Sequence, residues 1–140
     1  MISETGESSA LLALQRATHR TLHALGARLA ALDLAASEIN ALANLADGRP
    51  RSVRELSADT GIRATTLTGV LDRLERRGYL VRELDPADRR SFRLTLTAPG
   101  RAVAGQVRRA VTDLERHALA GLSARQVAGY HAVVTALQEV

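Results

Sequence analysis

The side chains in this sequence best suited to chemistry with another molecule are hydroxyl and guanidinium groups between residues 62 and 96. Threonine hydroxyls can contact a base edge or a phosphate, and an arginine can bind guanine through two parallel hydrogen bonds. Their spacing puts them on the outer side of an expected helix, which fits the major groove of duplex DNA. The candidates for DNA contact are Thr65, Thr66, Thr68, Arg73 and Arg76. The alternative is that this face is ordinary solvated surface.

Two further arginines, Arg89 and Arg90, end a segment rich in turn-forming residues at positions 85–90. We expect a turn with a cationic tip, whose arginines bind phosphate or a narrow minor groove. Two alternatives stay open here. Asp85 and Asp88 either neutralise the arginines, or they hold the turn and leave one arginine free.

The elements that must position these residues follow from changes of hydrophobic period. Apolar residues at helical spacing predict a helix that ends near Gly78, and a strand begins near Tyr79. From residue 91 the chain alternates strictly between apolar and polar side chains, which is typical of a half-buried returning strand. The inward face of the helix is predicted to carry Leu67, Val70, Leu71 and Leu74, and that of the returning strand Phe92, Leu94 and Leu96.

A short extended connector at residues 49–51 leads into another helix at residues 53–60. Ser52 and Glu55 fit a capping box, in which each side chain bonds the other residue's free backbone amide at a helix start. Gly61 then makes the turn into the arginine- and threonine-bearing helix. A capped helix, a glycine turn and a second helix form a helix-turn-helix, in which the second helix reads DNA. The basic hairpin after it strengthens that interpretation.

Two long helical regions are predicted outside this part of the chain, at residues 8–33 and 98–140. In the first, leucines follow steps of three and four residues, a stripe similar to a coiled-coil seam. In the second, Thr97 is a helix cap, and Ser123 with Gln126 forms a capping box that opens a last helix. We expect these regions to pair with a second copy of the chain. Packing within one chain is the alternative.

The four remaining candidates for ligand contact lie in these outer helices. His19 and His23 are one helical turn apart, a spacing found in metal sites, but no carboxylate lies beside them. We therefore expect no metal there, and assign His19, His23, His117 and Tyr130 as possible lining of an effector pocket. Ordinary helix packing or solvation explains each of them equally well.

Composition limits the function further. The 140 residues suffice for one domain, and the net charge of +4 is concentrated between residues 49 and 101, as in a nucleic-acid footprint. The basic residues are all arginine, which we attribute to genome composition. Cysteine is absent, which excludes thiolate chemistry, and without a glycine-rich phosphate loop or a histidine–carboxylate cluster we expect neither an enzyme nor a cofactor. There is no membrane-length apolar run and no signal peptide, so we expect a cytoplasmic protein.

The residues from Leu71 to Val81 and from Asp85 to Gly100 resemble the recognition-helix ending and the wing of the MarR family of transcriptional regulators. The resemblance implies an α+β, mainly α fold: a single domain at residues 1–140, with a winged helix-turn-helix lobe at 34–97 between dimerisation helices at 8–33 and 98–140. It also implies a homodimeric repressor that binds a pseudo-palindromic operator in double-stranded DNA and is released by a small-molecule effector. A constitutive or architectural DNA-binding protein is the alternative.

Three positions bear on how this chain would use that fold. Arg63 stands where the family usually has a capping residue, so the recognition helix is expected to start later, at a threonine. Gly69 stands where relatives often carry a larger basic side chain, and this removes a possible base contact. Asp72 would repel phosphate, so we expect it to pair with Arg76 or with a wing arginine.

Overall fold

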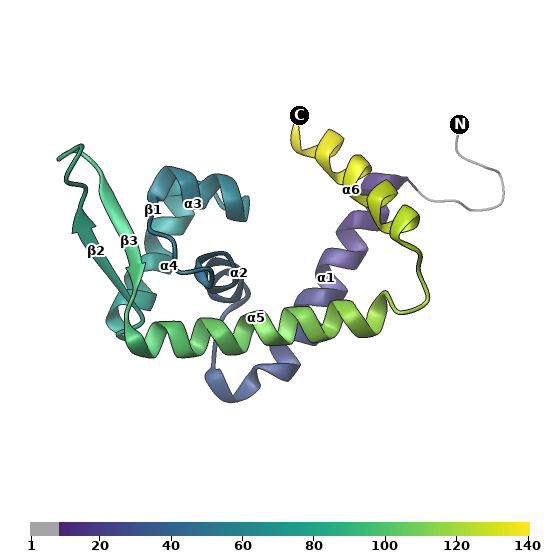
Figure 1. The fold of residues 1–140 in the computed structure, drawn as a ribbon, viewed down its shortest axis with the longest axis horizontal. Helices are drawn as coiled ribbons and strands as arrows, with labels where there is room; N and C mark the ends of the chain where they lie inside the picture. The colour runs from purple at the N-terminus through teal and green to yellow at the C-terminus, as the bar shows by residue number, and fades with distance from the viewer. Residues whose placement is uncertain (1–8) are drawn as a thin grey trace.

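The computed structural model describes residues 9–140, and the polar start at residues 1–7, expected to be frayed, lies outside the described residues. Figure 1 shows a lobe of short helices and a hairpin joined by one long helix to two further helices. The elements are α1 (Ala10–Arg28), η1 (Ala30–Leu32), α2 (Ala36–Leu45), β1 (Arg51–Ser52), α3 (Val53–Thr60), α4 (Ala64–Arg76), β2 (Leu80–Leu84), β3 (Phe92–Leu96), α5 (Ala98–Ala118) and α6 (Ala124–Gln138).

The short helix α3 has the bounds that its capping residues predict. The Glu55 amide donates to Ser52 Oγ at 3.0 Å, and the Ser52 amide donates to Glu55 Oε1 at 3.0 Å. The hydrogen bond from the Ser52 backbone lowers the pKa of Glu55, because it stabilises the carboxylate. Gly61 ends the helix in the left-handed region, at a φ of 74° that glycine adopts without strain. The helix-turn-helix is therefore confirmed.

The hairpin is part of a three-stranded antiparallel sheet with the order β1-β3-β2. Arg51 pairs with Leu94 and Ser52 with Arg93, so the expected extended connector ends as a third strand. A strand of two residues is too short to show a period in the sequence. Its effect is to fasten the base of the hairpin to the start of α3.

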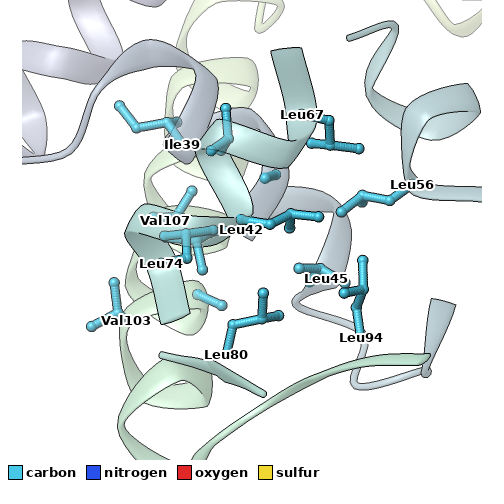
Figure 2. Close-up of a cluster of buried hydrophobic side chains, with 14 of the residues drawn as sticks. Ile39, Leu42, Leu45, Leu56, Leu67, Leu74, Leu80, Leu94, Val103 and Val107 are labelled. Carbon is cyan, nitrogen blue, oxygen red and sulfur yellow. The ribbon is translucent and has the colours of Figure 1, made fainter. Parts of the chain in front are cut away.

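The core lies inside the lobe, between the helix-turn-helix, the base of the sheet and the first half of α5. Figure 2 shows leucines of α2, α3, α4, β2 and β3 meeting there, and Leu42, Leu67 and Leu94 are fully buried. The prediction of an inward Phe92 is wrong, because its side chain is 46% exposed. Phe92 pairs with Leu84 at the far end of the hairpin, beyond the reach of the core.

The outer helices contribute much less to this core. Leu25 is the buried residue of α1, and none of the residues of α6 is buried. In Figure 1 these two helices lie together at one end of α5, away from the lobe. We call α1, α6 and the second half of α5 the arm. None of the helices in residues 9–140 is long and apolar enough to cross a membrane.

Candidate nucleic-acid interface

Helix α4 buries one side and presents the other to solvent. Leu67, Val70, Leu71 and Leu74 are buried, as predicted from their spacing. The opposite side carries exposed side chains at all five helix positions proposed for DNA contact, Thr65, Thr66, Thr68, Arg73 and Arg76. Thr68 Oγ1 donates to the Ala64 carbonyl at 3.0 Å, so its hydroxyl keeps its acceptor sites for another partner.

The start of α4 differs from the expectation. The helix begins at Ala64, with Arg63 as its N-cap, and Arg63 makes no side-chain capping bond. The start does not move to a threonine, because the Leu67 amide already bonds the Arg63 carbonyl at 2.8 Å. The threonine hydroxyls are thereby left on the helix surface instead of being used as caps.

Gly69 lies on the outer side of α4 next to the side chain of Arg73. A Cβ atom placed at Gly69 would be 3.8 Å from Arg73 Nη1, so the guanidinium extends back over the glycine by one helical turn. Long helical side chains point toward the N-terminus in this way. Within residues 9–140 Arg73 has no acidic partner, so its cationic group takes the place of the missing side chain at position 69.

The wing turn is held by its acidic residues. Asp85 Oδ1 accepts from the Ala87 amide at 2.9 Å, and Asp88 Oδ1 accepts from the Arg90 amide at 3.0 Å. No ion pair within the described chain involves Arg89 or Arg90, and both side chains are exposed. The acids therefore hold the turn, and they leave two arginines available where one was expected.

Asp72 connects the recognition helix to the wing. Arg82, on β2, donates to Asp72 Oδ1 at 2.5 Å, and Arg82 Nε lies 3.7 Å from Glu75 Oε2. Of the two partners expected for Asp72, the wing arginine is found, and Arg76 is left without an acid among the described residues. The pair neutralises an acid that would repel phosphate and links α4 to β2.

A buried arginine, which the sequence did not single out, links further elements of the lobe. Arg51 is 8% exposed, and it binds Asp47 through two nitrogens and Asp59 through Nε at 2.8 Å. The Arg51 hydrogen bond is the largest cause of a pKa of Asp47 well below its usual range. The network joins the end of α2 to β1 and α3.

The candidate effector residues are only partly brought together. A cavity of about 440 Å³ lies between α1, α5 and α6, and Tyr130 is part of its mainly apolar wall, with Leu25 and Leu114. His19, His23 and His117 are exposed and do not line it. In residues 9–140 no group of three or more metal-ligating side chains is present.

Known proteins resemble this chain in sequence and in fold. The model of the MarR family matches residues 32–91. YcgE, an uncharacterised HTH-type transcriptional regulator of Bacillus subtilis strain 168, is 33% identical over 84 residues, 60% of this chain and 54% of that protein. The chain therefore matches about half the length of this curated relative.

Solved structures extend the likeness over nearly the whole chain. A MarR-family transcriptional regulator from Silicibacter pomeroyi is 26% identical, with a TM-score of 0.78 over 91% of this chain and 86% of that chain. BpsR of Bordetella bronchiseptica, whose DNA binding is regulated by 6-hydroxynicotinic acid, is 24% identical, with a TM-score of 0.79 over 96% of both chains. Residues 32–91 thus match the model of the MarR family, and the described residues have the winged helix-turn-helix fold seen in solved MarR-family regulators.

Proposed function

We propose that this protein is a sequence-specific DNA-binding transcriptional regulator, and not an enzyme. The observation that carries the proposal is the pair of arginines at the wing tip, Arg89 and Arg90, exposed and without acidic partners in residues 9–140. They extend from the hairpin whose strand β2 is linked to α4 by the Arg82–Asp72 pair. A wing with cations for phosphate or the minor groove, beside a helix for the major groove, matches the two surfaces of a DNA duplex.

The direct contacts we assign are these. Arg89 and Arg90 bind the backbone or the minor groove, and Thr65, Thr66 and Thr68 reach base edges or phosphates from the helix. Arg73 reads guanine in the place that Gly69 leaves open, and Arg76 adds a positive charge. Of these, Arg73 has the geometry most suited to discriminate bases, since a guanidinium can form two parallel bonds to guanine.

The active species is a homodimer. Leu11, Leu122 and Val133 are between 46% and 48% exposed on the arm, and these side chains would gain by burial against a second copy. Residues 8–33 and 98–140 are the dimerisation helices, and residues 34–97 form the DNA-binding lobe. Two such lobes about one helical turn apart would read a pseudo-palindromic operator in the cytoplasm.

The regulator is a repressor that a small molecule releases. Support comes from the cavity between α1, α5 and α6, which lies in the arm and includes the hydroxyl-bearing Tyr130. BpsR, with a similar fold, has its DNA binding regulated by a hydroxylated aromatic acid. We keep His19, His23 and His117 as pocket candidates only if a partner copy completes the cavity.

Selection from a pool of random duplexes tests the central proposal. The purified protein should enrich a sequence with two inverted half-sites, and excess non-specific DNA should not compete it away. Enrichment of a single half-site contradicts the homodimeric reading. Equal affinity for all duplexes supports the alternative, a constitutive or architectural DNA-binding protein.

The effector proposal has its own experiment. 6-Hydroxynicotinic acid and related hydroxylated aromatic acids are titrated into the protein–operator complex, and release is followed by fluorescence anisotropy. Release by one of them, weakened in a Tyr130→Ala variant, supports the pocket in the arm. Release that is unchanged in this variant places the effector elsewhere.

A further inference from the structure

The turn that follows the recognition helix, at residues 77–79, contacts both segments that connect the lobe to the arm. Gly78 has a φ of 77°, and the Tyr79 amide donates to the Leu74 carbonyl at 3.0 Å. This closes the end of α4 and starts β2. We call residues 77–79 the post-helix turn.

On one side, Arg77 binds the connection between α1 and α2. Its Nη1 donates to the Asp33 carbonyl and its Nη2 to the Leu32 carbonyl, each at 2.7 Å. These carbonyls end the η1 turn, where intrahelical donors are missing. A guanidinium with two parallel donors can satisfy both at once.

Two further contacts hold the Arg77 guanidinium in this position. It lies 5.2 Å from the centre of the Tyr79 ring, and its Nη1 is 3.9 Å from Glu38 Oε2. Glu38 is 4% exposed, and its Oε1 accepts from the Ala35 amide at 2.8 Å. Because Oε2 has no hydrogen-bond partner in the described chain, Arg77 supplies the compensating charge for a buried carboxylate.

On the other side, the post-helix turn receives the start of α5. Thr97 Oγ1 donates to the Gly78 carbonyl at 2.5 Å, and the Thr97 amide donates to the Tyr79 carbonyl at 3.1 Å. Gly100 approaches so closely that a Cβ atom there would lie 1.9 Å from the Tyr79 oxygen. Helix α5 therefore begins in direct contact with the same three residues.

Two segments connect the lobe to the arm, residues 30–35 and α5 (Figure 1). The post-helix turn is hydrogen-bonded to the first segment and to Thr97 at the start of the second. We propose that this turn sets the angle between lobe and arm, and that Arg77 is a positioning residue and not a DNA contact. The inference rests on the proposed function, because in a homodimer this angle fixes the separation of the two recognition helices. The sequence alone suggested no particular role for Arg77, because it is one of many arginines between residues 49 and 101.

The competing explanation is that Arg77 is one more cation for phosphate. Loss of a phosphate contact weakens binding to a duplex with one half-site, and weakens it further on a duplex with two, where each subunit loses the contact. Loss of a positioning contact lowers the affinity only for a duplex with two half-sites. In that case both lobes must bind at once, and a lobe with a less fixed angle is less often at the separation that the two half-sites require.

The first experiment compares Arg77→Ala and Arg77→Gln with a matched control, Arg101→Ala. Arg101 also donates to a backbone carbonyl, that of Leu96 at 3.2 Å, but among the described residues its side chain makes no hydrogen bond or ion pair to the post-helix turn or to residues 30–35. On the two-half-site operator we expect the Arg77 variants to bind about tenfold more weakly, and on a single half-site almost unchanged. A clear loss on the single half-site, or no loss on the two-half-site operator, overturns the proposal.

The second experiment does not depend on DNA. Because the chain has no cysteine, Ala58→Cys on the exposed surface of α3 creates a unique site for a spin label on each lobe. Electron–electron distance measurements on the dimer should give a narrow distribution in the parent and in Arg101→Ala, and a broader one in Arg77→Gln. Gln can still donate to one carbonyl, so this variant should keep its fold, which circular dichroism checks.

The two experiments separate the possible failures. An unchanged distance distribution in folded Arg77→Gln overturns the positioning role, whether or not an operator is known. A parent protein that shows no preference for paired half-sites contradicts the proposed function, while the distance measurement still decides the role of Arg77.

Discussion

The substitution Gly100→Ala sets two physical effects against each other at one position of α5. Alanine is favoured over glycine inside a helix by roughly 1 kcal/mol, so helix propensity alone predicts a more stable protein. The added Cβ atom, however, would lie 1.9 Å from the Tyr79 carbonyl oxygen and 2.7 Å from its carbon. Both atoms belong to backbone and cannot rotate away.

The clash should decide the sign of the effect. Relief requires the start of α5 to retreat from the post-helix turn, which strains the packing by about 1–3 kcal/mol. It also breaks the two bonds from Thr97 to the Gly78 and Tyr79 carbonyls, at roughly 1 kcal/mol each. After the gain in helix propensity is subtracted, we expect a net loss of about 2–4 kcal/mol in the free energy of unfolding.

Thermal and urea denaturation, both at one fixed protein concentration, measure this loss. Gly105→Ala is the matched control on the same helix, because a Cβ atom there meets only the flexible Arg109 guanidinium, at 3.5 Å. The control should be as stable as the parent or slightly more stable. If Gly100→Ala matches Gly105→Ala, the contact between α5 and the post-helix turn is not the constraint that we describe.

Three further predictions concern residues of the lobe. Arg90→Ala should weaken operator binding and reduce the slope of log affinity against log salt by about 1, and an unchanged slope removes Arg90 from the interface. Gly69→Ala should stabilise α4 by up to about 1 kcal/mol, since its Cβ atom makes only an ordinary 3.8 Å contact with Arg73; a lower melting temperature refutes this. The pKa of Asp47 in the folded protein lies below the ordinary value of an aspartate, near 3.8, so its stabilising effect is present above about pH 4 and fades as the pH falls further. Asp47→Asn should therefore cost about 1 kcal/mol at pH 7, a modest value because the carboxylate is 43% exposed, and the difference from the parent should shrink in acid; a constant difference down to pH 2 contradicts the assignment.

Local signals in the sequence were enough to predict the helix-turn-helix and the hairpin of the lobe. The Ser52–Glu55 capping box and Gly61 determine α3 through bonds between near neighbours, and the spacing of four apolar residues identifies the buried side of α4. The inward placement of Phe92 was wrong, because alternation tells which side of a strand a residue faces but not whether a core lies opposite. The structure showed that the hairpin extends past that core.

Contacts between distant residues were the part that the sequence could not supply. Arg77 reaches carbonyls 44 and 45 residues away, and backbone carbonyls have no sequence signature. The partner of Asp72 was left open between a helical neighbour and the wing, and only the register of β2 brings Arg82 within reach. Arg51 had no distinguishing mark among the other arginines until its burial between Asp47 and Asp59 was seen.

Because α5 runs without a break from the base of the wing to the arm, a tilt at one end of this helix displaces its other end. Its 21 residues span about 30 Å at a rise of 1.5 Å per residue. A tilt of about 5° at the arm end would move the wing end by nearly 3 Å, close to the spacing of about 3.4 Å between neighbouring bases along a strand. An angular change in the arm too small to disturb its own packing would thus carry the wing almost one base step along the duplex.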